Sequence, residues 1–100
     1  MKKPNKKILE YKKELIEILS SINGDKNFMT EFLLDILTPA EFEDLALRWQ
    51  IVKKLSKGET HREVAGELGL GISTVTRGSR ELRNKHGGFA LMLQKIAKKK

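Results

Sequence analysis

The sequence contains no cysteine, few histidines and no long hydrophobic run. Without cysteine, the chain can form neither a disulfide framework nor a thiolate metal site. Its two histidines, His61 and His86, lie too far apart to indicate a zinc site. No apolar run approaches the roughly 18–20 residues that span a bilayer. No apolar segment or small-residue cleavage site follows the lysine-rich N-terminus. We therefore expect a cytoplasmic protein without a metal or a membrane partner.

The patterns typical of catalytic sites are also missing. The sequence shows no paired carboxylates, no nucleophile constellation and no glycine-rich phosphate loop after a strand, so we do not expect an enzyme. The charge balance favours a binding protein instead, because Lys and Arg number 20 against 13 for Asp and Glu, a formal net charge of +7. Such a balance favours a polyanionic partner, either nucleic acid or an acidic membrane surface.

The 100 residues suit one compact domain, residues 1–100. Hydrophobic residues make up 39% of the chain, which is enough for a modest core, and oligomerisation would add to it. Lysines gather at the two ends of the chain: Lys2, Lys3, Lys6, Lys7, Lys12 and Lys13 at one, and Lys98, Lys99 and Lys100 at the other. These ends are either solvated tails or arms that contact DNA phosphates.

Apolar residues recur at helical spacing along most of the chain, and no segment alternates as a strand does. Capping boxes predict helix starts after Thr38 and Thr60, each with a glutamate three residues later. We expect Ser73 to cap a further helix. The sequence thus predicts an all-α domain of six helices, over residues 6–22, 26–37, 39–57, 61–68, 74–85 and 89–98.

Residues 61–80 match the pattern of a helix-turn-helix. Two short helices that cross steeply need a small residue at their contact, which Ala65 supplies, and a turn residue that tolerates a left-handed conformation, which Gly69 supplies. Apolar residues at the right offsets lock the unit: Val64, Leu68, Leu70 and Val75. An ordinary helical hairpin is the alternative, but the basic residues that follow favour double-stranded DNA as the partner.

The second helix of this unit divides into three faces at about 100° per residue. One face is expected to pack on the core: Ile72, Val75, Ser79 and Leu82. A polar face offers hydroxyl and guanidinium groups to base edges and phosphates. With its surroundings, that face supplies the expected DNA-binding residues: Arg62, Gly71, Ile72, Ser73, Thr76, Arg80 and Arg83. The third face consists of Thr74, Arg77, Gly78 and Glu81. A helix that only reads DNA does not need this polar face, so we expect another group to contact it.

Arg48 falls on the expected inward face of the third helix, in line with Leu45, Val52 and Leu55. A buried charge without a partner is costly, so Arg48 and Arg77 together suit a carboxylate ligand. Glu81 lies one helical turn after Arg77 and either repels such a carboxylate or holds an ammonium group. The alternative is an ion network of Glu81 and the two arginines that needs no ligand.

Two segments resemble the tryptophan repressor family of bacteria, LLDILTPAEFEDLALRWQIVKKLSKGE and ELGLGISTVTRGSREL. The resemblance extends from Phe32 to Arg83 and is specific in the patterns LTP-x-E, R-x-x-IV and T-x-TRGS. It implies an intertwined, two-fold symmetric homodimer that binds operator DNA as a repressor. It also implies L-tryptophan as a corepressor, bound between the core and the reading head.

Carried over by position, the resemblance implies a set of ligand-binding residues. Arg48 and Arg77 would sandwich the indole and meet the carboxylate, and Gly78 would leave room for the ring. The carbonyls of Asp35 and Leu37 would receive the ammonium group. The pocket would also be lined by Thr38, Thr74 and Glu81, the last of which replaces the serine usual in the family.

Two alternatives to a tryptophan-controlled repressor stay open. One is a regulator from the related group of tryptophan-repressor-like proteins, which shares the fold without established tryptophan control. The other is a promoter-recognition module resembling region four of sigma factors, which would have no use for an inward Arg48. A non-specific basic chromatin or membrane-surface protein is disfavoured by the ordered helix-turn-helix.

Overall fold

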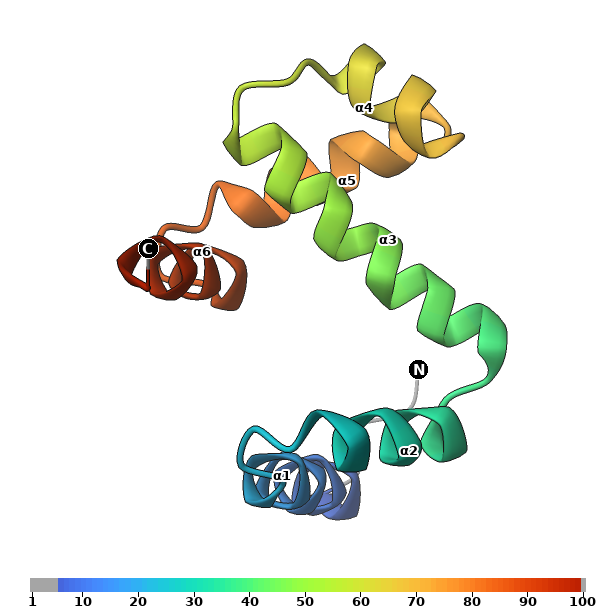
Figure 1. Ribbon diagram of the computed structural model, residues 1–100, viewed down its shortest axis with the longest axis vertical. Coiled ribbons are helices and arrows are strands. Elements are labelled where there is room, and N and C mark those ends of the chain that lie inside the picture. The colour runs from blue at the N-terminus through green and yellow to red at the C-terminus, as the bar shows by residue number, and fades with distance from the viewer. Residues whose placement is uncertain (1–5, 100) are drawn as a thin grey trace. The chain divides into compact units, whose positions relative to one another are not determined.

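The computed structural model of the chain describes residues 6–99, so Lys2, Lys3 and Lys100 of the lysine-rich ends lie outside it. This part of the chain is all-helical, as predicted, with no strand. Its helices, in order, are α1 (Lys6–Ser21), α2 (Lys26–Ile36), α3 (Pro39–Ser56), α4 (His61–Leu68), α5 (Ile72–Leu82) and α6 (Gly88–Lys98) (Figure 1). The chain divides into two units, Met1–Phe42 and Glu43–Lys100, which are described separately.

The first unit contains α1 and α2, joined by a tight turn. Asn23 and Gly24 adopt positive φ angles of 52° and 81°, which reverses the chain after α1. Asp25 then begins α2, because its carboxylate accepts the backbone N–H of Phe28 at 3.0 Å. Among the described residues of this unit, Ile22 alone is a buried apolar residue, at 5% exposure.

Most apolar side chains of the first unit remain open to solvent in the single chain. On α1 they are between 37% and 62% exposed: Ile8, Leu9, Tyr11, Leu15, Ile16 and Ile18. On α2 they are Phe28, Leu34 and Ile36. An exposed apolar surface of this extent is typical of helices that pack against another chain.

A threonine cap begins α3, as the sequence predicts. The hydroxyl of Thr38 accepts the backbone N–H of Glu41 at 3.1 Å, and the Glu41 carboxylate accepts the backbone N–H of Thr38 at 2.8 Å. These bonds hold the pKa of Glu41 below its usual value. Gly58, at φ 92°, follows the end of α3.

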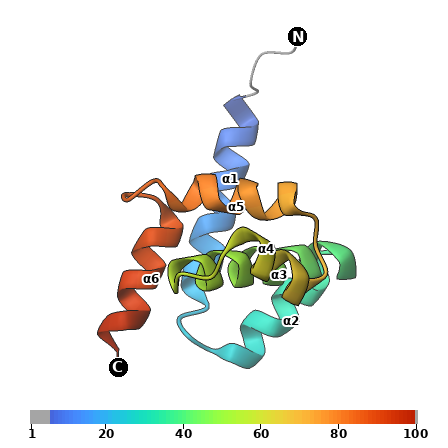
Figure 2. The ribbon, with the colours of Figure 1, turned by 90° about the horizontal axis from the view of Figure 1, so that it is seen from above.

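The second unit holds the core of the described structure. Ile51 of α3 meets Val64 and Ala65 of α4 and Val75 of α5 in one buried cluster. Around this cluster pack the half-buried side chains of Leu55, Leu68 and Leu70. Both views show α4 and α5 side by side next to α3 (Figures 1 and 2). This cluster fixes the two short helices to the long one.

Two predictions about α5 are wrong. Ser73 does not cap this helix, because Gly71 is the extended N-cap residue and Ser73 already lies in the first turn. The helix also ends at Leu82 rather than near Lys85. A turn follows in which the side-chain oxygen of Asn84 accepts the backbone N–H of His86 at 3.1 Å. The asparagine thus ends the helix before the two glycines at 87 and 88 are reached.

Candidate functional site

The helix-turn-helix forms as predicted, starting from the cap of α4. The hydroxyl of Thr60 accepts the backbone N–H of Glu63 at 3.1 Å, and the Glu63 carboxylate accepts the backbone N–H of Thr60 at 2.9 Å. The same bonds lower the pKa of Glu63. Gly69 ends α4 in the left-handed region at φ 68°, as the sequence predicts. Ala65, at 7% exposure, lies where the two helices touch.

The side chains expected to contact DNA lie mostly on the solvent side of this unit. The exposed members are Arg62, Gly71, Ile72, Ser73, Arg80 and Arg83. Ile72 was expected to face the core and does not, since it is 52% exposed. The reason is its position as the first residue of α5, one turn before Val75, where the core begins.

Thr76 is half-buried rather than free on the surface. Its hydroxyl donates to the backbone carbonyl of Ile72 at 3.0 Å and lies 3.5 Å from Nδ1 of His61. These contacts hold the hydroxyl between the start of α4 and the first turn of α5. They therefore limit how this side chain could turn toward a base edge.

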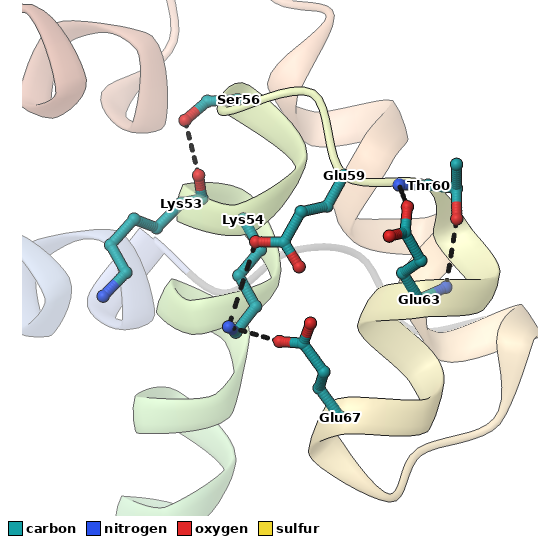
Figure 3. A network of polar contacts seen from close by, with 7 residues as sticks. All are labelled: Lys53, Lys54, Ser56, Glu59, Thr60, Glu63 and Glu67. Atoms are coloured by element: carbon teal, nitrogen blue, oxygen red, sulfur yellow. Dashed lines mark hydrogen bonds and ion pairs between the residues drawn. The ribbon is translucent and has the colours of Figure 1, made fainter.

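A polar network joins α3 to α4 on the side of Lys54 (Figure 3). The ammonium group of Lys54 lies 2.6 Å from a carboxylate oxygen of Glu67 and 3.9 Å from one of Glu59. The bond to Glu67 raises the pKa of Lys54, and the same bond lowers the pKa of Glu67. Burial raises the pKa of Glu59, whose other carboxylate oxygen is buried without a hydrogen-bond partner. The network adds a polar contact between α4 and the last turns of α3 to the apolar contacts of the buried cluster.

The contact between α3 and α5 is made by Gly78. A Cβ atom at this position would lie 2.5 Å from Cγ2 of Ile51, well inside van der Waals contact. Glycine therefore lets the two helices approach closely at this point. The sequence-based prediction that Gly78 leaves room for a ligand ring stays a prediction, while Ile51 already occupies part of that space.

A cavity of about 460 Å³ opens beside this contact, inside the second unit. Its walls come from α3 and α5, and Leu70 and Phe89 complete them. Its full lining is Asp44, Leu47, Arg48, Ile51, Val52, Leu70, Thr74, Arg77, Gly78, Glu81 and Phe89. The volume falls within the range of about 300–1,000 Å³ that is usual for small-molecule sites.

The cavity brings together the candidate ligand residues of α3 and α5. The whole third face of α5, which the sequence left without a partner, lies along it: Thr74, Arg77, Gly78 and Glu81. Arg48 lines the opposite wall. The remaining candidates, Asp35, Leu37 and Thr38, belong to the first unit and are not among the lining residues. In that unit, Thr38 serves as the cap of α3.

The expectation that Arg48 points into the core is wrong for the single chain. Arg48 is exposed, and Leu45 on the same stripe is 44% exposed. The core ends before this part of α3, because Ile51 and Val52 are its last fully buried side chains toward the start of the helix. Arg48 is thus a wall of an open cavity. Sequence reasoning missed Asp44, although its spacing of four residues from Arg48 places both on one face.

The charged side chains of the cavity do not neutralise one another. Within residues 6–99, no ion pair or side-chain hydrogen bond joins Glu81 to Arg48 or Arg77, so the alternative of a self-contained ion network is not found. The same range holds no group of side chains arranged to bind a metal ion. Among its helices, none has the length and hydropathy needed to cross a bilayer.

Comparison with known proteins identifies the family. The family model described as Trp repressor protein matches residues 10–97. A Trp operon repressor homolog from Vibrio campbellii is 40% identical over 80 residues, which cover 76% of this chain and 78% of that protein. Another from Vibrio parahaemolyticus is 36% identical over 90 residues, with coverages of 84% and 85%. One from Chlamydia trachomatis is 35% identical over 81 residues, with coverages of 80% and 85%. This is a family of transcription regulators and not of enzymes, and the chain belongs to it.

Proposed function

We propose that the protein is a transcriptional repressor that binds double-stranded operator DNA in the cytoplasm through α4 and α5. The observation that carries this proposal is the helix-turn-helix, whose second helix begins with the exposed Ile72 and Ser73 and carries the exposed Arg80 in its last turn. The relatives' name, Trp operon repressor homolog, supports it. The net charge of +7 favours the approach of a polyanion. Membership of the family leaves no support for a sigma-factor module.

The exposed residues divide by chemistry. Arg62, Arg80 and Arg83 suit phosphates, because a guanidinium group binds a phosphate through two parallel hydrogen bonds. The residues at the start of α5 enter a groove first in this motif and are assigned to base edges: Gly71, Ile72 and Ser73. The half-buried Thr76 is assigned there too, which requires its hydroxyl to leave the backbone carbonyl of Ile72. Phosphate contacts would set the affinity and the groove contacts the sequence preference.

The functional form is a homodimer. In the single chain, α1, α2 and α6 leave large apolar side chains exposed, including Tyr11, Phe28 and Leu91 at more than half of their surface. A second copy would cover such surfaces, and a symmetric dimer would present two copies of α5 to successive major grooves. Two half-sites about one helical turn of DNA apart, or a multiple of it, are the expected operator.

The ligand of the cavity is a small carboxylate, which we assign as L-tryptophan. Arg48 and Arg77 stand on opposite walls and would receive the carboxylate. Because one wall is the reading helix itself, a bound ligand would favour one angle of α5 relative to α3. The ligand would thus act as a corepressor by stabilising the orientation that fits DNA.

The test is a titration of the protein with an operator selected from random DNA, with and without millimolar L-tryptophan. We expect operator affinity to rise about 5- to 150-fold with the ligand, and ligand affinity to rise equally with the operator. Arg48→Ala should abolish the response, while Lys57→Ala, which removes a positive charge outside the cavity, should keep it.

Two outcomes would contradict parts of this proposal. A failure to select any preferred sequence would refute the operator-binding function. Sequence-specific binding that L-tryptophan does not change would instead identify a regulator of this family without tryptophan control. Calorimetry with other amino acids would then show whether the cavity takes a different corepressor.

A further inference from the structure

The first residue of α4 contacts the reading helix. Nδ1 of His61 lies 3.5 Å from the hydroxyl oxygen of Thr76, which belongs to the second turn of α5. Both side chains are half-buried, so water competes less for this contact than it does on an open surface. A distance of 3.5 Å is long for a hydrogen bond, so a small movement of either side chain closes or opens the contact.

The hydrogens of this contact can be counted. The Thr76 hydroxyl has one hydrogen, which it donates to the backbone carbonyl of Ile72 at 3.0 Å. The hydroxyl oxygen therefore turns a lone pair toward His61. A hydrogen bond between the two side chains then requires a hydrogen on Nδ1 of the imidazole ring. In a neutral ring this leaves Nε2 as the acceptor, and protonation adds a second hydrogen there.

The charge on the imidazole ring decides what the Thr76 hydroxyl can do. A neutral ring can move its hydrogen from Nδ1 to Nε2, after which Nδ1 accepts a hydrogen bond from the hydroxyl. The hydroxyl oxygen then offers its lone pairs to DNA, which suits the amino groups of adenine and cytosine. A charged ring has hydrogens on both nitrogens and can only donate, so the hydroxyl keeps its own hydrogen for another acceptor. In the major groove, such acceptors include O6 of guanine and O4 of thymine.

No carboxylate neutralises the ring in the described part of the chain. Within residues 6–99, no ion pair involves His61. The nearby carboxylates are used elsewhere, because Glu63 belongs to the cap of α4 and Glu59 and Glu67 lie beside Lys54. Histidine is the side chain whose charge ordinarily changes between about pH 5 and 8. The contact is therefore open to a change of charge in that range.

The other charges around His61 are those of exposed arginines. Arg62 follows it on α4, and Arg80 lies one turn after the threonine on α5. Arg77 and Glu81, the other charged residues of α5, line the cavity on another face. A proton on the ring thus adds a positive charge to a basic surface, which raises affinity for all DNA. A change in sequence preference, by contrast, requires the contact with the hydroxyl.

We propose that His61 positions the Thr76 hydroxyl, and that the proton on its ring sets which base edges this hydroxyl reads. This inference rests on the operator-binding function proposed above, since it names a residue that sets the sequence preference. With the ring charged, the hydroxyl donates and favours guanine or thymine on the contacted strand. With the ring neutral, it also accepts from adenine or cytosine. The sequence preference should therefore change with pH at the base pair that Thr76 contacts.

The experiment compares the operator preference of the full chain at two pH values. An operator is selected from random duplex DNA at neutral pH, and each of its base pairs is then replaced in turn. Every duplex is titrated with protein at about pH 5.5 and about pH 8, on either side of the usual change of charge of histidine. Thermal melts at both pH values confirm that each variant folds.

Three variants separate the roles of the side chains. Thr76→Val removes the hydroxyl but keeps a β-branched side chain, so it identifies the base pair that the hydroxyl contacts. His61→Gln keeps a group that donates and accepts hydrogen bonds but does not change charge in this range. His86→Gln is the matched control, because His86 is the other histidine of the chain and lies exposed in the turn after α5.

For the wild type, we expect the preference for guanine or thymine at the base pair of Thr76 to be at least about fivefold stronger at the lower pH. This is the low end of what one well-placed base contact contributes. His61→Gln and Thr76→Val should both lose this change, and His86→Gln should keep it. Thr76→Val should still bind all duplexes more tightly at the lower pH, because its ring still gains a charge.

Nitrogen NMR of the free protein tests the contact without DNA. We expect the neutral ring of His61 to carry its hydrogen on Nδ1 in the wild type, and to lose this tautomer preference in Thr76→Val. A neutral ring with its hydrogen on Nε2 in the wild type would contradict the count of hydrogens at the contact.

The DNA titrations distinguish a failure of this inference from a failure of the proposed function. A preference that is the same at both pH values, or that still changes in His61→Gln, would overturn the inference and leave operator binding intact. A gain at the lower pH that is equal for every duplex would show that the ring acts only as a charge, which also overturns the positioning role. Failure to select any operator would overturn the proposed function and this inference with it.

Discussion

Replacing Gly78 with alanine tests whether the close approach of α3 and α5 is a structural requirement. The added Cβ would lie 2.5 Å from Cγ2 of Ile51. Ile51 is 2% exposed and β-branched, so this methyl group has little freedom to move away. The helices must separate locally, and overpacking of this kind costs about 1–3 kcal/mol of unfolding free energy. Part of that cost is offset, because alanine favours a helix over glycine by up to about 1 kcal/mol.

Gly66→Ala provides the matched control for this prediction. Gly66 lies inside α4, is exposed, and would meet nothing within 4 Å if it carried a Cβ. This variant gains the helix propensity without the clash, so it should be more stable than the wild type. The two variants should therefore differ by about 1–3 kcal/mol in unfolding free energy. Urea denaturation followed by circular dichroism, at one fixed protein concentration, measures the difference.

Equal stability of the two alanine variants would refute the reasoning about the contact at Gly78. A double-mutant cycle with Ile51→Ala identifies the clash more closely. Removal of the Ile51 side chain should cost less in the Gly78→Ala background than in the wild type, because it also removes the clashing methyl group. A coupling free energy near zero would show that the two positions do not interact in solution.

The remaining predictions concern assembly, DNA contacts and acid stability. Light scattering at micromolar concentration should give a dimer, and a mass near 11.4 kDa would refute the dimer. Arg83→Ala should weaken binding to all DNA and reduce the salt slope by about one unit. Thr76→Ala should instead change the preference among operators, and equal losses from both would refute the division of roles. Because its folded-state pKa is lowered, Glu63 should stabilise the fold above about pH 4.3 and lose this effect as the pH falls further. Glu63→Gln should therefore make acid unfolding less steep, and an unchanged pH profile would contradict this assignment.

Local signals in the sequence predicted the helix starts at Thr38 and Thr60 and the turn at Gly69. Each depends on bonds or backbone angles within a few residues, so a short window of sequence contains the necessary information. The prediction that Ser73 caps α5 was wrong because several neighbouring residues can take the cap position, and Gly71 adopts the extended conformation there instead. Boundaries of this kind depend on where α5 packs on α4.

The candidate site was less accessible from the sequence because it depends on the core. Periodicity placed Leu45, Arg48 and Val52 on one stripe of α3, but it could not show that the core covers only the later part of that stripe. The pairing of the α3 and α5 walls is set by the contact of Gly78 with Ile51, which joins residues 27 positions apart. Asp44 became a candidate only when that contact placed its wall opposite Glu81.

The position of the cavity explains how a ligand could act on DNA binding without touching DNA. The buried cluster of Ile51, Val64, Ala65 and Val75 joins α4 and α5 to α3 on one side. The cavity lies along α5 beside that cluster, with unpaired charges on both walls. Each wall carries an arginine without a side-chain partner in the described structure, and a carboxylate bound between the walls would give both arginines a partner. The ligand would then add stability to one angle of α5, and a coupling of about 1–3 kcal/mol, equivalent to roughly 5- to 150-fold in operator affinity, needs only a few such charged hydrogen bonds.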